Sequence, residues 1–179
     1  QAEFVAGHLI YERNNVLLTH PFDPETLTFT GDPIPVGSNI VAISGASRSL
    51  FSVSTNDRMI FMRGKALSEE AGLSWWDPSG QLTEEIPERD AFNTVVLSPD
   101  DRLIALTVFD VRETFRDIWI YEIERGFRSR FTLAETDEGD PLWSPDGRYL
   151  YYIAKPDLHY NVYRKAVSGI RPSELVFDF

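Results

Sequence analysis

Short apolar runs alternate with short polar turns along the whole chain, and three of the run-turn-run units are versions of one another. In each unit an apolar run ends in Ser, a polar turn closes on Arg, and a second apolar run follows. The units are Leu50–Met62, Val95–Thr107 and Leu142–Ile153. Their arginines at positions 58, 102 and 148 lie 44 and 46 residues apart. A repeat of this length, built from short strands and sharp turns, is typical of a β-propeller blade.

Each repeat continues with two further short runs, so the pattern predicts four strands per repeat. The predicted repeats span approximately residues 1–37, 48–87, 93–134 and 141–179. The first repeat has no Ser-turn-Arg unit, and we expect its innermost strand to be absent. Its three predicted strands are His8–Glu12, Val16–Asp23 and Leu27–Thr30. The sequence therefore predicts an all-β protein made of four-stranded antiparallel blades, with about four repeats and an incomplete first one.

The recurring turn has the chemistry of a tight connection between strands. Ser144–Gly147 reads Ser-Pro-Asp-Gly, in which Pro supplies a φ of about −65° and Gly supplies a positive φ. Ser98–Asp101 is the same turn with Asp in the last place, and Asp tolerates the left-handed region better than most residues. Flanking runs such as Ile118–Tyr121 are apolar at every position, which is typical of strands covered on both faces. Stacked blades contain such strands.

The composition of the chain excludes several classes of partner and of covalent cross-link. The chain has 179 residues, of which 17 are basic and 28 acidic, and its formal net charge is −11. Nucleic-acid binding requires a concentrated basic surface, so we expect no nucleic-acid partner. No run approaches the ~18 apolar residues of a membrane helix, and the sequence shows no secretion signal, so we expect no membrane insertion within this chain. The lack of cysteine rules out disulfides.

The motifs of catalysis and metal binding are missing from the sequence. His8, His20 and His159 lie in different repeats, and neither a His-Glu-x-x-His motif nor a Gly-x-Ser-x-Gly elbow is present. Asp137–Asp140 is the densest acidic run, but it lacks the alternating ligand spacing of a calcium loop, and we expect a solvated surface loop there. We therefore expect a protein that is not an enzyme and that holds no cofactor and no metal.

Two motifs together resemble the repeat of the TolB-like β-propellers. Leu97–Arg102 reads Leu-Ser-Pro-Asp-Asp-Arg, and Asp117–Tyr121 reads Asp-Ile-Trp-Ile-Tyr. The amino-acid sequences of repeats one to three are most similar to those of the propellers linked to bacterial serine/threonine kinases. Because that family usually has six or more blades, the resemblance implies that this chain is part of a larger six- to eight-bladed propeller. A homodimer that completes the ring, and four blades that close alone, are the alternatives. The resemblance also implies a periplasmic or extracytoplasmic location.

The loops between the second and third strands of each blade form the candidate binding surface. Long loops on a rigid scaffold are where propellers usually bind their partners. The loops are Arg63–Gly72, Phe109–Arg116 and Lys155–Tyr160. The candidate binding residues on them are Arg112, Arg116, His159 and Tyr160.

A second interpretation of the arginines stays open. Arg112 and Arg116 lie close in sequence to Asp110 and Asp117, and pairing with them would only hold the shape of the loop. The arginines that recur in every repeat are expected to have a structural role, such as covering an aromatic side chain.

The sequence favours a non-catalytic propeller module for protein–protein interaction or ligand sensing, in a larger bacterial envelope or kinase-linked protein. The expected partner is a protein or peptide. One alternative is a propeller segment that gates a prolyl-oligopeptidase-type peptidase whose catalytic residues lie outside this chain. Another is a carbohydrate-binding propeller, which the loop aromatics Phe115 and Tyr160 keep open.

Overall fold

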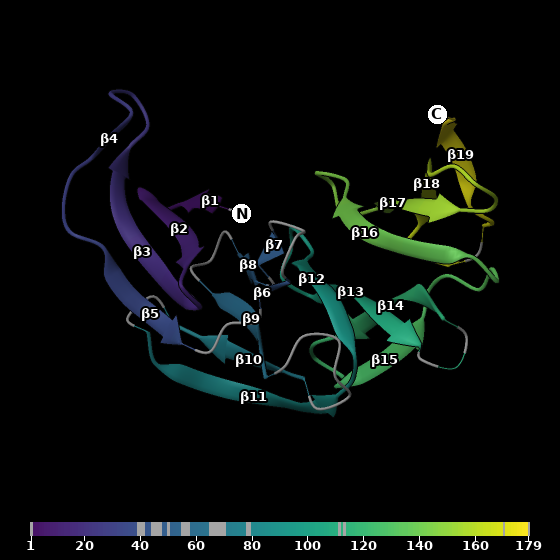
Figure 1. Ribbon diagram of the computed structural model, residues 1–179, viewed down its shortest axis with the longest axis horizontal. Helices are drawn as coiled ribbons and strands as arrows, with labels where there is room; N and C mark the ends of the chain where they lie inside the picture. The colour runs from purple at the N-terminus through teal and green to yellow at the C-terminus, as the bar shows by residue number, and fades with distance from the viewer. Residues whose placement is uncertain are drawn as a thin grey trace. The chain divides into compact units, whose positions relative to one another are not determined.

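The protein is built of β-strands that fall into two compact units, Gln1–Asp90 and Ala91–Phe179. The structure is a computed structural model, and it describes residues 2–38, 42–43, 48–49, 51–54, 58–64, 71–77, 80–110, 112, 114–169 and 171–178. Within these ranges every regular element is a strand, and four antiparallel sheets of four or five strands account for most of them (Figure 1). The prediction of an all-β fold made of four-stranded antiparallel sheets is therefore confirmed.

The first sheet corrects the prediction that the innermost strand is absent. Strand β1 (Ala2–Val5) pairs antiparallel with β2 (His8–Arg13), which pairs with β3 (Val16–Asp23). The turn between β1 and β2 contains only Ala6 and Gly7, with φ of 47° and 77°. Two positive φ values make the two-residue turn that suits a hairpin, so the strand forms without the Ser-Pro-Asp motif.

The outer edge of the first sheet has two short strands in place of one. Strands β4 (Thr28–Phe29) and β5 (Ile34–Ser38) both pair with β3, at its two ends. The sequence predicts a single outer strand at residues 27–30, so β5 is the element that it misses.

The second sheet of the first unit has the order β11-β10-β9-β8. Its strands are β8 (Phe51–Val53), β9 (Met59–Arg63), β10 (Gly72–Trp76) and β11 (Leu82–Arg89). A separate two-stranded sheet consists of β6 (Ala42–Ile43) and β7 (Arg48–Ser49). In the predicted loop at 63–72, residues 65–70 lie outside the described part of the chain.

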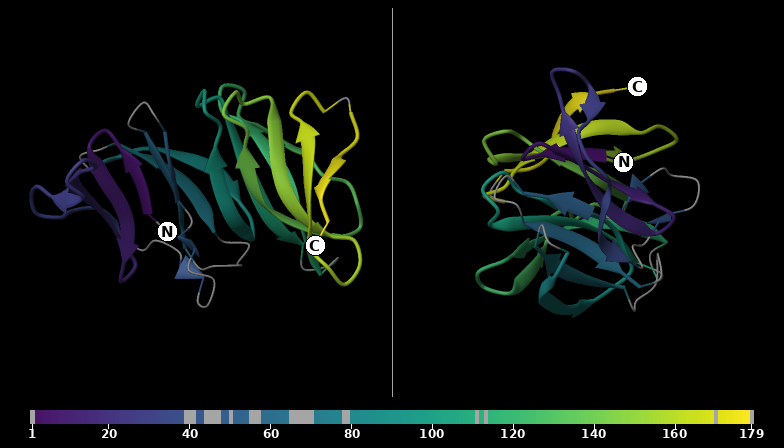
Figure 2. Two further views of the ribbon diagram at one scale, coloured as in Figure 1. Left: turned by 90° about the horizontal axis from the view of Figure 1, so that it is seen from above. Right: turned by 90° about the vertical axis from the view of Figure 1, so that its left-hand side faces the viewer.

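The second unit contains two four-stranded sheets that lie face to face (Figure 2). The strands of one are β12 (Phe92–Leu97), β13 (Leu103–Asp110), β14 (Phe115–Glu122) and β15 (Phe127–Arg130). The strands of the other are β16 (Asp137–Trp143), β17 (Tyr149–Lys155), β18 (Asn161–Ala166) and β19 (Glu174–Phe177). Both sheets follow the order of the chain, as in a propeller blade.

Each unit has its own apolar core between its two larger sheets. In the first unit, Leu17, Phe51 and Phe61 are fully buried members of one cluster. In the second unit, Ile118 and Leu150 are fully buried in the other. The burial of β17 alternates, so that Leu150 lies in the core while its neighbours in sequence are only half-buried.

The serine of the recurring turn binds the backbone of the strand that follows it. The Ser98 hydroxyl accepts a hydrogen bond from the backbone N–H of Leu103 at 2.9 Å, and the Ser144 hydroxyl accepts one from Tyr149 at 3.0 Å. The recurring arginines do not share one partner. The Arg58 guanidinium carbon lies 4.1 Å from the ring centroid of Trp75, whereas Arg148 pairs with Asp146 in its own turn.

Candidate functional site

The acidic run that the sequence places in a solvated loop is the beginning of strand β16, so that prediction is wrong. Asp137 pairs with Lys155 and Glu138 pairs with Ala154 in the register of β16 with β17. Glu138 is only 3% exposed. The density of acidic residues at positions 137–140 suggests a solvent-exposed loop. However, β16 is the first strand of its sheet, and it contacts β14 of the neighbouring sheet, which covers these side chains.

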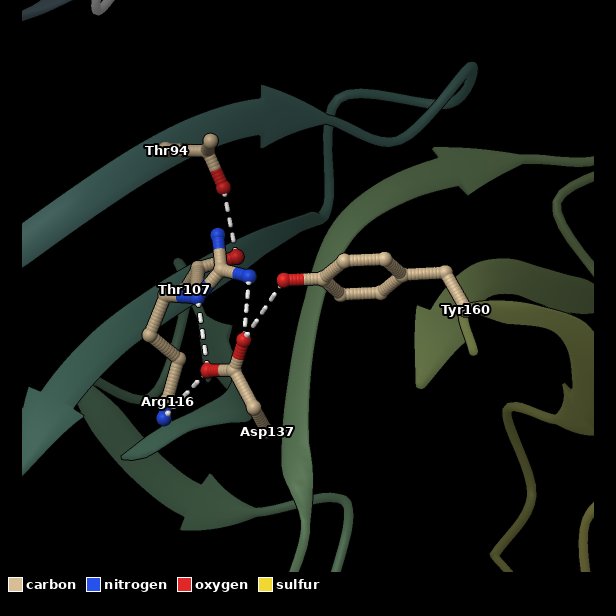
Figure 3. A network of polar contacts seen from close by, with 5 residues as sticks. All are labelled: Thr94, Thr107, Arg116, Asp137 and Tyr160. Carbon is tan, nitrogen blue, oxygen red and sulfur yellow. Dashed lines mark hydrogen bonds and ion pairs between the residues drawn. The ribbon is translucent and has the colours of Figure 1, made fainter. Parts of the chain in front are cut away.

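An ion pair between Arg116 and Asp137 joins the beginnings of β14 and β16 (Figure 3). Arg116 Nε donates to Asp137 Oδ1 at 2.8 Å, and Nη2 donates to Oδ2 at 2.7 Å. The backbone N–H of Arg116 also donates to Oδ1, at 3.0 Å. The side chains are 19% and 27% exposed. Hydrogen bonds from Arg116 hold the pKa of Asp137 below its usual value, so the carboxylate stays ionised.

This geometry corrects the interpretation in which Arg116 pairs with a neighbour in sequence, whereas Arg112 does contact Asp110 through its backbone N–H. Arg116 reaches Asp137, which is 21 residues away. Asp117 pairs instead with Arg130, whose Nη2 lies 2.8 Å from its Oδ1. Both ion pairs connect different strands, and therefore they fix how strands lie together rather than the shape of one loop.

Tyr160 joins the ion pair from the loop between β17 and β18. Its hydroxyl donates to Asp137 Oδ2 at 3.5 Å, which is a long hydrogen bond, and its ring remains exposed. The ammonium of Lys155 lies 5.3 Å from the centre of that ring. Figure 3 shows the ring pointing toward the carboxylate from the side of β16 opposite to Arg116.

His159 and Arg112 lie farther out than the ion pair. The His159 backbone N–H donates to Asp157 Oδ1 at 2.9 Å, and its ring is 70% exposed. Arg112 is exposed, and its backbone N–H donates to Asp110 Oδ1 at 2.7 Å. Among the contacts that the described residues make, Asp137 brings together Arg116 and Tyr160, and no contact joins Arg112 or His159 to them.

The four predicted binding residues therefore divide into two groups. Arg116 is largely covered and supports the site from beneath. Three exposed residues, Arg112, His159 and Tyr160, together with the half-buried Lys155, form what we call the loop-end surface at this end of the second unit. The sequence does not identify Asp137 and Glu138 as part of the site, because both stand in what looks like an ordinary acidic surface run.

Gly139 leaves room for the guanidinium of Arg116. A Cβ at this position would lie 3.2 Å from Arg116 Nη1 and 3.5 Å from the methyl group of Thr107. We expect Gly139→Val to displace the guanidinium and to lower the free energy of unfolding by about 1 to 3 kcal/mol, the usual cost of overpacking. Valine suits a strand well, so a loss cannot come from backbone propensity. Gly139→Ala should cost less in the same urea titration, and an unchanged stability for both variants would contradict this packing.

The described residues show neither a metal cluster nor a spanning helix. No three His, Cys, Asp or Glu side chains among them gather so that they would hold a metal ion. None of the described segments forms a helix that is long and apolar enough to cross a membrane. The arrangement can offer hydrogen-bond donors, positive charge and one aromatic face to a partner.

Comparison with solved structures identifies the fold. No protein-family model matches the sequence, and no curated protein matches it. A putative TolB from Agrobacterium tumefaciens is similar, with a TM-score of 0.73 and 18% identity over 97% of this chain and 58% of that one. TolB from Acinetobacter baumannii has a TM-score of 0.71 and 14% identity over 99% of this chain and 43% of that one. A structure from a study of two prolyl endopeptidases has a TM-score of 0.65 and 16% identity over 100% of this chain and 29% of that one.

The chain thus spans about half the length of the two TolB structures. At these identities the likeness concerns the fold, and it agrees with the Ser-Pro-Asp turns and the four-stranded sheets described above. The fold of this chain is that of a run of β-propeller blades, similar to those of the two TolB structures.

Proposed function

We propose that this chain is a non-catalytic propeller module that binds a protein or peptide partner through its loop-end surface. The observation that carries the proposal is the Arg116–Asp137 ion pair beneath Tyr160. Because the pair joins β14 and β16, it gives the exposed loop at residues 156–160 a fixed base. Exposed side chains on a rigid base can bind a partner with little loss of conformational entropy.

The loop-end surface favours a partner segment that carries a carboxylate. Arg112 and Lys155 supply positive charge at this surface, the exposed Asp157 in the same loop supplies a negative charge, and the formal net charge of the whole chain is −11. A carboxylate on the partner would be attracted to Arg112 and Lys155 and repelled by Asp157 and the acidic remainder of the chain, which gives orientation. Tyr160 adds an aromatic face, and tyrosine often contributes a large share of the binding energy at interfaces.

Peptide selection followed by one substitution tests the proposal. Peptides of twelve residues are selected from a random display library on the full chain, and their affinity is measured for the wild type and for Tyr160→Ala. We expect Tyr160→Ala to weaken binding about 10-fold or more, as loss of a central interface tyrosine does. Tyr149→Ala is the matched control, because Tyr149 stands at the opposite end of β17 and has Arg164 over its ring.

Two results of this experiment would contradict the proposal. Unchanged affinity for Tyr160→Ala, or the same loss for both tyrosine variants, would show that the selected peptides bind elsewhere. A library that yields no binder at all would count against a peptide-binding module.

A second candidate function is a propeller that belongs to a prolyl-oligopeptidase-type peptidase. The observation in its favour is the likeness to the prolyl endopeptidase structure over the full length of this chain. The catalytic residues would then lie outside these 179 residues. A selected pool dominated by proline-containing peptides would support this candidate, whereas acidic peptides without proline would support the first.

We further propose that the chain works within a larger propeller of six to eight blades, on the extracytoplasmic side of a bacterial membrane or in the periplasm. Exposed apolar side chains on two sheets support this proposal. Phe4 and Phe29 are exposed on the first sheet, and Leu142 and Phe177 are exposed on the sheet that contains β16 and β19. Additional blades would cover these apolar side chains. The sequences of the repeats favour a kinase-linked protein as the larger protein to which this chain belongs.

A further inference from the structure

A buried carboxyl group lies beside the ion pair of the site. Glu138 follows Asp137 on β16, and it lies between the two sheets of the second unit with 3% of its surface exposed. Its Oε2 atom has no hydrogen-bond partner among the described residues. A buried carboxylate oxygen without a partner is costly when it is charged, and much less costly when it carries a proton.

Charged and titratable groups face Glu138 from each neighbouring strand. They are Asp117 on β14, Arg130 on β15, Tyr152 on β17 and Lys165 on β18. Asp137, its neighbour in sequence, and Asp140, two residues away, lie on its own strand. Thr132, in the segment between β15 and β16, is its hydrogen-bond partner.

Both neighbouring cations are already engaged. Arg130 Nη2 donates to Asp117 at 2.8 Å, and its Nε donates to the carbonyl of Thr132 at 3.1 Å. The ammonium of Lys165 donates to the carbonyl of Phe131 at 2.6 Å. The positive charges therefore attract Glu138 only at a distance, and Asp117 opposes them.

The balance of these effects favours the protonated acid. Burial, the largest effect, raises the pKa of Glu138 to about 7, and Asp117 acts in the same direction. The hydrogen bond from Thr132 and the charges of Arg130 and Lys165 lower the pKa only in part. Burial raises the pKa of Tyr152 to about 12, so its hydroxyl keeps its proton when Glu138 titrates, and it donates to Ser173 at 2.6 Å.

Ionisation of Glu138 would affect the neighbouring Arg116–Asp137 ion pair. An ionised Glu138 gains most by reaching water, which requires the beginning of β16 to move away from β14 of the neighbouring sheet. Asp137 is the adjacent residue, and its two carboxylate oxygens hold Arg116 within less than 3 Å. A shift that hydrates Glu138 therefore pulls on the Arg116–Asp137 pair.

We propose that Glu138 is a pH-sensing residue whose ionisation loosens the beginning of β16 and, with it, the ion pair that supports the loop-end surface. The regulation of partner binding rests on the proposed function, but the effect on β16 does not. Unfolding of the chain, titration of Glu138 and exchange of the Arg116 Nε–H can all be measured without a peptide, so they test the effect on β16 whether or not a peptide binds.

The sign of the pH dependence follows from the direction of the shift. The pKa is raised on folding, from 4.5 to about 7, so the proton on Glu138 stabilises the folded chain fully below pH 4.5, and this stabilisation is lost as the pH rises to 7. We expect the equilibrium constant for unfolding of the wild type to rise about 100-fold from pH 5 to pH 8. Glu138→Gln should remove most of this rise.

Glu135→Gln is the matched control, since Glu135 is exposed and lies three residues away in sequence. It should retain the full pH dependence of the wild type. The two Gln variants share all titratable groups except Glu135 and Glu138, so the difference between them carries the result. An equal rise in the Glu138→Gln and Glu135→Gln chains would overturn the proposal.

A second measurement covers the case in which Glu138→Gln does not fold. In the wild type, the carboxyl carbon of Glu138 is followed by nuclear magnetic resonance, together with exchange of the Arg116 Nε–H with water. We expect the carbon to titrate with a midpoint near pH 7, as the buried acid requires. Exchange of the Arg116 Nε–H should accelerate at least 10-fold more than base catalysis explains. A midpoint near pH 4.5, or exchange that follows base catalysis alone, would contradict the proposal.

Discussion

Phe61→Ala is expected to lower the free energy of unfolding of the first unit by about 3 to 5 kcal/mol, the cost of deleting a fully buried aromatic side chain. Phe61 on β9 is fully buried in the core between the two sheets of that unit. Its ring stacks on Trp76 with 4.9 Å between centroids. The measurement is urea unfolding of the full chain, and Phe127→Ala, at an exposed phenylalanine, should change stability by less than about 0.5 kcal/mol.

A partner substitution makes this prediction specific to the packing seen here. A Cβ at Gly37 on β5 would lie 2.7 Å from the Phe61 ring, so Gly37→Ala should itself cost about 1 to 3 kcal/mol. In the Phe61→Ala background the added methyl group has space, and its cost should disappear. Additive effects of the two substitutions would show that β5 does not lie against Phe61, because residues in contact give non-additive energies.

The periodic features of the fold can be predicted from the sequence because each depends on neighbours in the chain. Strand alternation and the Ser-Pro-Asp turn are local, and the Ser144 hydroxyl binds a backbone group only five residues away. Strands β1 and β5 are among those that the repeat pattern misses: β1 is joined to β2 by a turn of Ala6 and Gly7, and β5 pairs with the edge of β3. Neither the Ala6-Gly7 turn nor the segment before β5 carries a distinctive motif, so the repeat pattern does not predict these two strands.

The candidate site is harder to predict because its contacts join residues in different sheets. Arg112, Arg116, His159 and Tyr160 can be chosen from the loop pattern, but the partner of Arg116 cannot. Nearness in sequence favours Asp110 and Asp117, whereas the register of β16 against β14 places Asp137 there. The same register buries Glu138, and no local signal distinguishes one acidic residue of a run from the next.

Asp137→Ala is expected to lower the free energy of unfolding of the second unit by about 2 to 4 kcal/mol. The substitution leaves the largely covered Arg116 guanidinium without its carboxylate, and breaking a buried pair on one side costs about 3 to 5 kcal/mol. The partial exposure of both side chains reduces this figure. Urea unfolding at pH 7 measures the loss, and Asp157→Ala, at a carboxylate that is 70% exposed, is the matched control with an expected change below about 0.5 kcal/mol.

The pH dependence and a double substitution decide whether the ion pair is the cause. The pKa of Asp137 is lowered on folding, so its contribution is present at neutral pH, above the unfolded-state value, and is lost as the pH falls through the folded-state value. The difference between wild type and Asp137→Ala should therefore shrink in acid. Combining Asp137→Leu with Arg116→Met should restore part of the stability, because an apolar pair leaves no buried charge unpaired. If the double variant is as unstable as the sum of the two single ones, Asp137 acts through something other than Arg116, and the base that we assign to the loop-end surface does not exist.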